Sequence, residues 1–135
     1  MPQYPDVQRW DIFRTNLNPT VGSEQQGDAR PVIIVSNDGF NQHFDMVTVV
    51  PVTSMEGKTR TPYPFEVVLS GDEVTPNNVS IAMPQQIRSI SKGRLLKKIS
   101  TITDEAVQAK IENRILEHLG IAFIEDDSDD PSAPL

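Results

Sequence analysis

The chain has no cysteine, and its 135 residues include only two histidines. Without cysteine, disulfides and thiolate metal sites are excluded. His43 and His118 lie far apart in the sequence, and neither has a second histidine or a carboxylate at helical spacing, so both fit surface or packing positions better than a metal site. No nucleophile elbow, phosphate-cradling glycine loop or dinucleotide fingerprint occurs. We therefore expect neither a metal nor a cofactor.

Long apolar segments are also missing. Nowhere do about 18 consecutive apolar residues occur, which a membrane-spanning helix would need. The first ten residues, MPQYPDVQRW, contain neither the basic region nor the apolar region of a secretion signal. These absences predict a soluble, cytoplasmic protein that does not contact membranes.

Basic residues are the minority, with 12 Lys and Arg against 19 Asp and Glu, and a formal net charge of -7. This balance alone argues against nucleic-acid binding. The acids are unevenly distributed, however, because EDDSDDPSAPL (125–135) holds five of them and no base, a composition typical of disorder. Conversely, RSISKGRLLKK (88–98) has five bases and no acid. This basic stripe is either a nucleic-acid surface or an ordinary solvated face, and charge alone favours the solvated face.

The length is right for one domain. We expect an N-terminal arm over 1–8, a folded domain over 9–124 and an acidic disordered tail over 125–135. Short β-branched or alternating segments predict strands over 9–17, 31–36, 45–54, 64–70, 78–83 and 86–91, with one helical turn within 37–45. Pro51 cannot donate a ladder hydrogen bond, which indicates an edge or a bulge. Strand follows strand without a long helix between them, so the sequence predicts a mainly β fold, a small antiparallel barrel.

One helix is predicted at the C-terminal end of the domain. Thr103 is a suitable N-cap residue, and Gly120 can end the helix in a left-handed conformation. Val107, Ile111, Ile115 and Leu119 recur at steps of four and form an apolar stripe. The stripe either covers the barrel or meets its counterpart on a second subunit, and periodicity does not choose between these.

The segment GSEQQGDARP (22–31) is longer than a hairpin connection requires. It carries Glu24 and Arg30, and a Thr53-Ser54 pair ends a later strand. A carboxylate, a guanidinium and hydroxyls without a metal suit phosphoryl chemistry on RNA, in which the substrate supplies its own nucleophile, the 2′-OH. Alternatively, the loop has no catalytic role: its glycines only make turns, and Arg30 pairs with Asp28 at the surface.

Three segments together resemble the MazF/PemK (Kid-like) family of toxin endoribonucleases from bacterial toxin-antitoxin systems. They are WDIFRTNLNPTVGSEQQGDARPVIIVSND, VVPVTS and QIRSISKGRL, which stand in the family's order and spacing. The resemblance spans about Arg9 to Ile121. It implies an SH3-like barrel of the CcdB, MazF and Kid type with a C-terminal helix, assembled as a homodimer.

The resemblance also implies a function, which is sequence-specific cleavage of single-stranded mRNA without a metal. The 2′-OH would attack in line and leave a 2′,3′-cyclic phosphate and a 5′-OH, and a cognate antitoxin protein would neutralise the enzyme. The family's catalytic arginine corresponds to Arg30, its threonine to Thr53 and its loop glutamate to Glu24. RNA contacts are then expected from the loop, the strand end and the basic stripe: Gly22, Ser23, Gln25, Ser54, Gln86, Arg88, Lys92 and Arg94.

The chain departs from the Kid-like members at one place. Those members have Arg-x-Asp directly before the Gln of the Q-x-R segment, where this chain has Met83, Pro84 and Gln85. The acid and base roles given to that pair therefore do not transfer, and Glu24 is the candidate base. Gln86 and Arg88 fit an RNA groove and an ordinary surface equally well, and Trp10 fits core packing better than base stacking.

Two other functions fit a fold of this kind. A CcdB-like protein would poison DNA gyrase by binding, but such proteins use an apolar and aromatic chain end, whereas this chain ends in DDPSAPL. A catalytically silent SH3-like binding module is the other alternative. The cleavage motif and the identity of the antitoxin do not follow from the residues.

Overall fold

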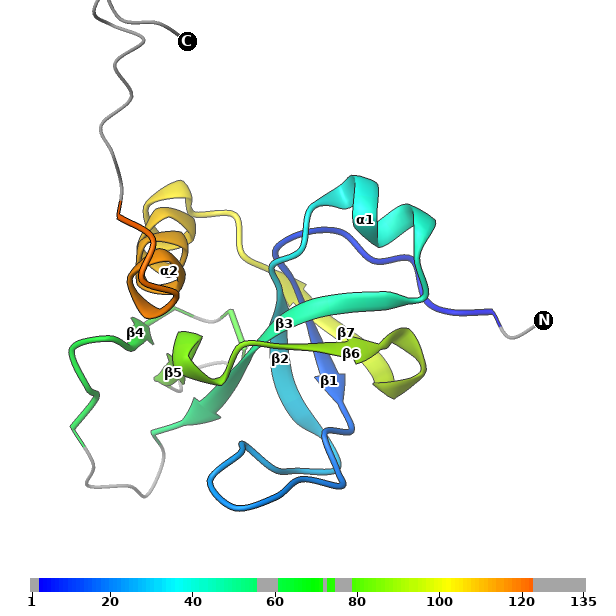
Figure 1. Ribbon diagram of the computed structural model, residues 1–135, viewed down its shortest axis with the longest axis horizontal. Coiled ribbons are helices and arrows are strands. Elements are labelled where there is room, and N and C mark those ends of the chain that lie inside the picture. The colour runs from blue at the N-terminus through cyan, green and yellow to red at the C-terminus, as the bar shows by residue number, and fades with distance from the viewer. Residues whose placement is uncertain (1–2, 56–60, 72, 75–78, 123–135) are drawn as a thin grey trace, which may run out of the picture.

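The computed structural model describes residues 3–55, 61–71, 73–74 and 79–122. The expected acidic tail lies outside the described residues, as does the first residue of the strand expected over 78–83. The described chain forms one antiparallel sheet with helices beside it (Figure 1). The strands are β1 (Asp11–Thr15), β2 (Arg30–Ile34), β3 (Met46–Ser54), β4 (Val67–Leu69), β5 (Ser80–Ala82), β6 (Arg88–Ser91) and β7 (Leu95–Thr101). The α-helices are α1 (Asp38–His43) and α2 (Glu105–His118), and the 3-10 helices are η1 (Pro84–Gln86) and η2 (Lys92–Arg94).

The sheet has the order β4-β5-β3-β2-β1-β7, with β6 also paired to β3. It is open, whereas the sequence predicts a barrel, because no pairing among the described residues joins β4 to β7. β4 has only three residues, and the chain leaves the sheet after Leu69. The two ends still approach at one point, where the Ser100 hydroxyl donates to the Glu73 carbonyl. The predicted fold class is confirmed in its antiparallel strands and C-terminal helix.

β3 is the central strand and has different neighbours along its length. Its first half pairs with β6, from Met46 opposite Ser91 to Val49 opposite Arg88, and its last three residues pair with β5. Pro51 lies between the part of β3 that pairs with β6 and the part that pairs with β5. At this point η1 connects β5 to β6, so the missing N–H of Pro51 costs no ladder hydrogen bond. The prediction that Pro51 marks a sheet edge is therefore wrong. The Pro51 carbonyl still accepts from the Met83 amide at 2.9 Å.

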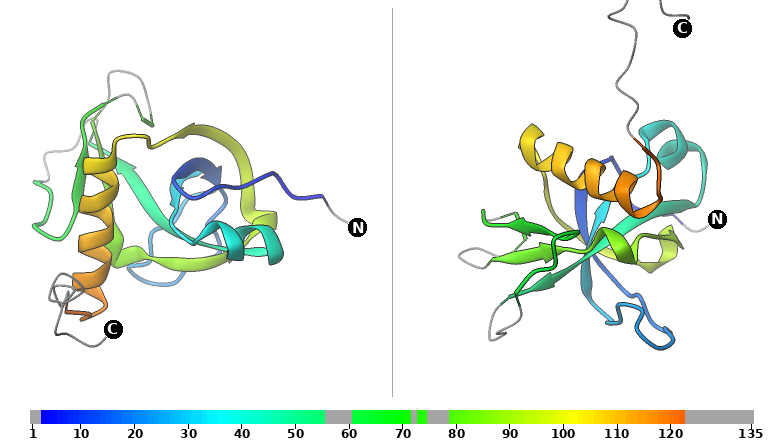
Figure 2. Two further views of the ribbon diagram at one scale, coloured as in Figure 1. Left: turned by 90° about the horizontal axis from the view of Figure 1, so that it is seen from above. Right: turned by 60° about the vertical axis from the view of Figure 1, so that its left-hand side comes forward.

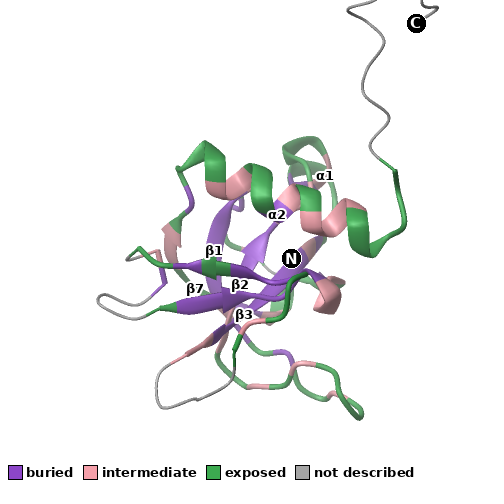
Figure 3. Cartoon of the chain, turned by 90° about the vertical axis from the view of Figure 1, so that its left-hand side faces the viewer, coloured by how far each residue is buried: buried purple, intermediate pink, exposed green. Residues whose placement is uncertain are grey.

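Alternating side chains of β1, β2 and β3 build two apolar clusters, one on each face of the sheet. The first cluster lies under α2 and includes Ile12, Ile33, Val50 and Ile111. The second lies on the other face and includes Val7, Phe13, Leu17, Val32, Ile34, Val47, Val49, Ile90 and Leu95. Figure 3 shows the central strands buried and the outer face of α2 exposed. β-branched residues suit strands that are covered on both faces, which explains why 31–36 and 45–54 were predictable.

α2 lies across one face of the sheet, as Figure 2 shows. Its apolar stripe covers its own sheet, since Ile111 is fully buried and Val107 and Ile115 pack against the first cluster. Leu119 does not join them and is 54% exposed. The cap is Asp104, whose carboxylate accepts from the Ala106 amide at 2.9 Å, and the prediction of Thr103 is wrong by one residue. Gly120 adopts the predicted left-handed conformation, with a φ of 71°.

β7 is the one strand that the sequence analysis missed. It lies at the end of the sheet and pairs only with β1. Leu96, Lys97 and Lys98 are all exposed, so the strand shows no alternation of buried and exposed positions. The part of the basic stripe within β7 is thus an edge strand.

Candidate active site

Arg30 begins β2 directly after the β1–β2 loop (16–29). On one side it pairs with Thr15 of β1. On the other side β2 pairs with β3, and Val32 lies opposite Pro51. Continued by two residues, this register places Arg30 opposite Thr53. Opposed residues of an antiparallel pair carry their side chains on the same face. The fold therefore brings together the two residues that the sequence analysis considered catalytic.

This row lies on the face of the second cluster, at the end of the sheet from which the β1–β2 loop projects (Figure 1). Arg30 is half-buried, Thr53 is 5% exposed and Ser54 is half-buried. Arg88 belongs to the same face because it pairs with Val49, which is buried in that cluster. A guanidinium at the surface thus lies on the same face as the Thr53 hydroxyl. Ser54, the next residue of β3, belongs to the opposite face with Val50 and Val52, so the expected RNA contact by Ser54 is not placed beside Arg30.

The loop holds the Arg30 side chain through amide groups. Arg30 Nε donates to the Gln26 carbonyl at 3.3 Å. With its amide oxygen turned toward the guanidinium, Gln25 accepts from Arg30 Nε at 3.1 Å and from Nη2 at 3.3 Å. Among the described residues Arg30 forms no ion pair, so the alternative pairing with Asp28 is not found. Within the described residues no carboxylate is paired with the guanidinium, so an anion from solvent can bind there.

Glu24 is exposed at the outer part of the loop. Its Oε1 accepts from the Val21 amide at 2.6 Å, and its own amide donates to the Val21 carbonyl at 3.2 Å. Gly22, within this turn, has a φ of 59° and open space around it. Glu24 therefore supports the turn in this conformation, and its second carboxylate oxygen makes no hydrogen bond with the described residues.

The loop is anchored to the body at several points, although its length suggested a free segment. Arg94 Nη1 donates to the carbonyls of Asn16 at 3.2 Å and Asn18 at 2.6 Å. Arg88 Nη1 donates to the Leu17 carbonyl at 3.5 Å. Two arginines of the basic stripe thus hold the first half of the loop, a role that no local pattern in the sequence indicates.

Gln86, at the end of η1, holds the second half of the loop. Its Oε1 accepts from the Gln25 amide and its Nε2 donates to the Ser23 carbonyl, both at 3.0 Å. Three of the expected RNA-contacting residues, Ser23, Gln25 and Gln86, are therefore brought together beside Arg30.

Lys92 is the expected RNA contact that lies apart from this group. It is 8% exposed, and its ammonium donates to the Asn41 carbonyl in α1. Its backbone amide also donates to the Asp45 carbonyl at 2.8 Å. In this structure Lys92 attaches η2 to α1.

Metal-binding groups are scattered in the part of the chain that the structure describes, where no three His, Cys, Asp or Glu side chains gather around a possible ion. His43 is exposed on α1, with Nδ1 2.8 Å from the Gly39 carbonyl oxygen, and His118 is exposed at the end of α2. No helix within the described ranges is both long and apolar enough to cross a membrane.

An exposed aromatic pair lies on the other side of Thr53, and the sequence analysis did not single it out. Thr53 pairs with Ile81 and Ile81 with Val68, so β4 lies two strands away. In the turn before β4, the rings of Tyr63 and Phe65 stack with centroids 5.1 Å apart and are 51% and 42% exposed. Trp10, by contrast, is 9% exposed in the first cluster, which confirms the expectation of core packing.

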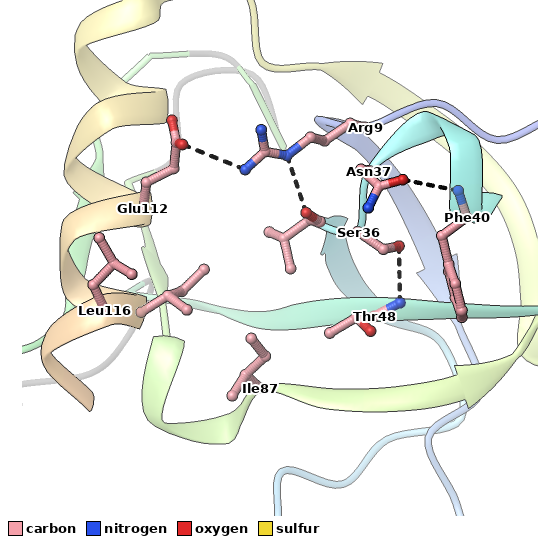
Figure 4. A pocket seen from close by; sticks show the side chains of 10 residues that line it. Arg9, Ser36, Asn37, Phe40, Thr48, Ile87, Glu112 and Leu116 are labelled. Atoms are coloured by element: carbon pink, nitrogen blue, oxygen red, sulfur yellow. Dashed lines mark hydrogen bonds and ion pairs between the residues drawn. The ribbon is translucent and has the colours of Figure 1, made fainter. Parts of the chain in front are cut away.

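A groove of about 550 Å³ lies between α1 and α2, apart from the Arg30 row (Figure 4). Arg9 crosses its wall, with Nη2 3.5 Å from Glu112 Oε2 and Nε donating to the Val35 carbonyl at 3.0 Å. Phe40, Ile87 and Leu116 supply apolar surface. No residue of the Arg30 row lines this groove.

The open antiparallel sheet with its C-terminal helix, and Arg30 opposite Thr53, agree with the kind of protein that the sequence resembles, a small toxin of a toxin-antitoxin system. The model of one such family, the PemK-like, MazF-like toxins of type II toxin-antitoxin systems, matches residues 8–119. The chain belongs to this family.

Named relatives agree with this membership. The chain is 31% identical over 118 residues to Endoribonuclease MazF of Staphylococcus saprophyticus. The matched region covers 87% of this chain and 95% of the relative. MazF from Deinococcus radiodurans has the same fold, with a TM-score of 0.71 at 23% identity over 88% of this chain and 99% of that one. An endoribonuclease in complex with its cognate antitoxin, from a mycobacterial species, gives a TM-score of 0.68 at 23% identity over 87% and 99% of the two chains.

Proposed function

We propose that this MazF-like toxin is an endoribonuclease that cleaves single-stranded mRNA at short sequence motifs, in the cytoplasm and without a metal ion. The observation that carries the proposal is Arg30, which lies opposite Thr53 on one sheet face at the foot of a loop. The Staphylococcus saprophyticus relative, an endoribonuclease, supports the reaction type.

In the proposed reaction the 2′-oxygen of one nucleotide attacks the adjacent phosphorus. The O2′–P bond forms and the P–O5′ bond breaks, which leaves a 2′,3′-cyclic phosphate and a 5′-OH. Arg30 stabilises the additional negative charge of the pentacoordinate intermediate, because a guanidinium offers two parallel donors to phosphate oxygens. The hydroxyl of Thr53, which lies on the same sheet face as Arg30, hydrogen-bonds the same phosphate.

Two protons move in this reaction. Glu24 is the proposed base that removes the 2′-OH proton, because it is an exposed carboxylate of the loop and stands at the position of the family's loop glutamate in the resemblance. An arginine keeps its proton in proteins, so Arg30 supplies charge and the leaving 5′-oxygen takes its proton from water. Glu24 must leave the Val21 amide to act, which requires the outer loop to rearrange when RNA binds.

The exposed pair Tyr63 and Phe65 supports a single-stranded substrate. Unpaired bases stack on aromatic side chains, and a base-paired strand cannot present its bases in this way. The two rings and the Arg30 guanidinium lie on opposite sides of the Thr53 strand end. RNA crossing the end of β3 would place its backbone at Arg30 and a neighbouring base at the rings.

A cognate antitoxin is the proposed regulator. The mycobacterial relative was solved with its antitoxin, and the resemblance implies an acidic, partly disordered antitoxin segment. Arg94, Lys97 and Lys98 offer it a basic surface outside the acidic tail. We propose a homodimer as the assembly that both RNA and antitoxin bind.

One experiment separates the enzyme from its alternatives. Purified protein is incubated with a long single-stranded RNA in EDTA, and the 5′ ends of the fragments are sequenced. An endoribonuclease of this kind gives fragments with 5′-OH ends at recurring motifs. A gyrase poison or a silent binding module leaves the RNA intact, and inhibition by EDTA would contradict the metal-independent mechanism.

A further inference from the structure

Two consecutive glutamines of η1 hold different parts of the molecule. Gln85 Nε2 donates to Glu66 Oε2 at 2.8 Å, at the turn before β4. Gln86 faces the β1–β2 loop, where its amide accepts from the Gln25 backbone and donates to the Ser23 backbone, each at 3.0 Å. One side chain thus binds the loop backbone at two points, more than sixty residues away in sequence.

The loop residue that Gln86 holds is also the one that contacts Arg30. With its amide oxygen turned toward the guanidinium, the Gln25 side chain accepts from Arg30 Nε at 3.1 Å and from Nη2 at 3.3 Å. Gln25 therefore connects the two, with its backbone fixed by Gln86 and its side chain fixing the guanidinium. A second contact from the same loop, Arg30 Nε to the Gln26 carbonyl at 3.3 Å, depends on the same backbone position.

We infer that Gln86 is a positioning residue for Arg30: it holds Ser23 and Gln25 so that the Gln25 amide points the guanidinium along the sheet face that carries Thr53. The inference rests on the proposed function of Arg30 at the phosphate. It differs from a direct RNA contact by Gln86, because the amide oxygen and the amide nitrogen are each engaged by the loop.

The expected kinetic effect follows from this geometry. A misplacement of a catalytic group by about 1 Å can cost on the order of 10²-fold in rate. Loss of Gln86 frees the loop without removing Arg30, so we expect kcat to fall by about ten- to hundred-fold. KM should change little, because Gln86 contributes through Arg30 and not through the RNA.

The test compares Gln86→Ala with Gln85→Ala, which removes the same amide from the same 3-10 helix but leaves the loop contacts. Solvent exchange of the Gln25 backbone N–H and of the Arg30 Nε–H is measured by NMR, alongside kcat and KM for RNA cleavage. In Gln86→Ala we expect both exchange rates to rise about tenfold or more and kcat to fall. In Gln85→Ala both exchange rates stay near the wild-type values.

A third variant covers the case in which Gln86→Ala does not fold. Gln86→Glu keeps an oxygen that can accept from the Gln25 amide but loses the donor to Ser23, so an intermediate exchange rate supports the inference. Unchanged Gln25 exchange in a folded Gln86 variant would overturn it. Equal effects of the two glutamine variants would also overturn it, because they indicate general loosening of η1. A raised KM at constant kcat would do the same, because it indicates an RNA contact.

If wild-type protein does not cut RNA, the proposed function fails, while the exchange rates still decide whether Gln86 orients Arg30.

Discussion

Gly27 lies beneath the side chain of Arg30. A Cβ added to Gly27 would lie 3.1 Å from Arg30 Nε and 3.2 Å from Arg30 Cβ. The backbone there has a φ of 150°, which residues with a side chain rarely adopt. The loop thus needs glycine at this position both for its backbone path and for the place that the arginine occupies.

We therefore predict that Gly27→Ala lowers the rate of RNA cleavage by moving the Arg30 guanidinium. The loss should be about tenfold or more, since small displacements of a catalytic group are costly. The control is the double variant with Arg30→Ala, which keeps the contact with the Cβ of residue 30 but has no guanidinium to displace, so Gly27→Ala should cause little further loss of rate. Two independent, additive losses would show that Gly27 acts by another route.

Arg30→Ala should lower the cleavage rate by about 10² to 10³-fold, as removal of one charge-stabilising group usually does. The free energy of unfolding should change little, because Arg30 is half-buried and forms no ion pair with the described residues. Arg30→Lys keeps the charge without the planar fork and should recover only part of the rate. Activity above about a third of wild type in Arg30→Ala would rule out this role.

The hydroxyl of Thr53 should matter less than the charge of Arg30, because a neutral hydrogen bond contributes less than a charged one. Thr53→Val removes the hydroxyl and keeps the branched shape that this nearly buried position needs. We expect a loss of about tenfold in rate, and the unfolding midpoint in urea checks that the variant is folded under the assay conditions. A loss as large as that of Arg30→Ala would give Thr53 a further role in the reaction.

How far the sequence predicts this molecule depends on whether a residue acts locally. The β-branched segments that became β2 and β3 could be recognised because each is buried on both faces. β7 was missed because Leu96, Lys97 and Lys98 are all exposed on a strand with one neighbour. Thr103 and Asp104 are both good caps, so sequence alone could not locate the helix start to one residue.

The site shows the same limit. Arg30, Thr53 and Glu24 could be proposed from motifs, since each stands in a short recognisable segment. The anchors of the loop could not, because Arg94, Arg88 and Gln86 reach residues 61 to 78 positions away and their carbonyl partners have no signature in sequence. The buried position of Lys92 likewise depends on how η2 meets α1.

The cap of α2 can be checked by stability. Asp104→Ala removes the carboxylate that accepts from the Ala106 amide, so the free energy of unfolding should fall by about 1 kcal/mol. Thr103→Ala, one residue earlier, should have a smaller effect. Urea denaturation of both variants measures the difference, and a larger effect at Thr103 would move the helix start.

Removal of residues 125–135 should leave RNA binding equal or stronger. The truncation deletes five acids and leaves 14 acids against 12 bases, so repulsion of the RNA phosphates decreases. Weaker binding at constant salt would show instead that the tail contributes contacts to RNA.

The surface between α1 and α2 is the face that we expect to form the homodimer. Apolar side chains border the groove on both sides: Phe44, 57% exposed, stacks on Phe40 of the groove wall, and Ile121, 53% exposed, lies beside Leu116. Most of the apolar stripe of α2 packs against its own sheet and is not available to a second copy. A second copy would instead contact the apolar side chains that border the groove, together with the exposed Leu119.

A dimer is expected because the resemblance to the MazF/PemK family implies one. A symmetric interface should bury on the order of 1,200 Å² or more and persist at micromolar concentration. Light scattering should then report about twice the 15.0 kDa chain mass. Leu116→Asp should shift the protein toward one chain mass, because it places a charge in the groove, whereas Leu96→Asp on exposed β7 should not. A mass near one chain, in wild-type protein that still cuts RNA, would contradict the dimer and require the entire RNA surface to lie on a single sheet.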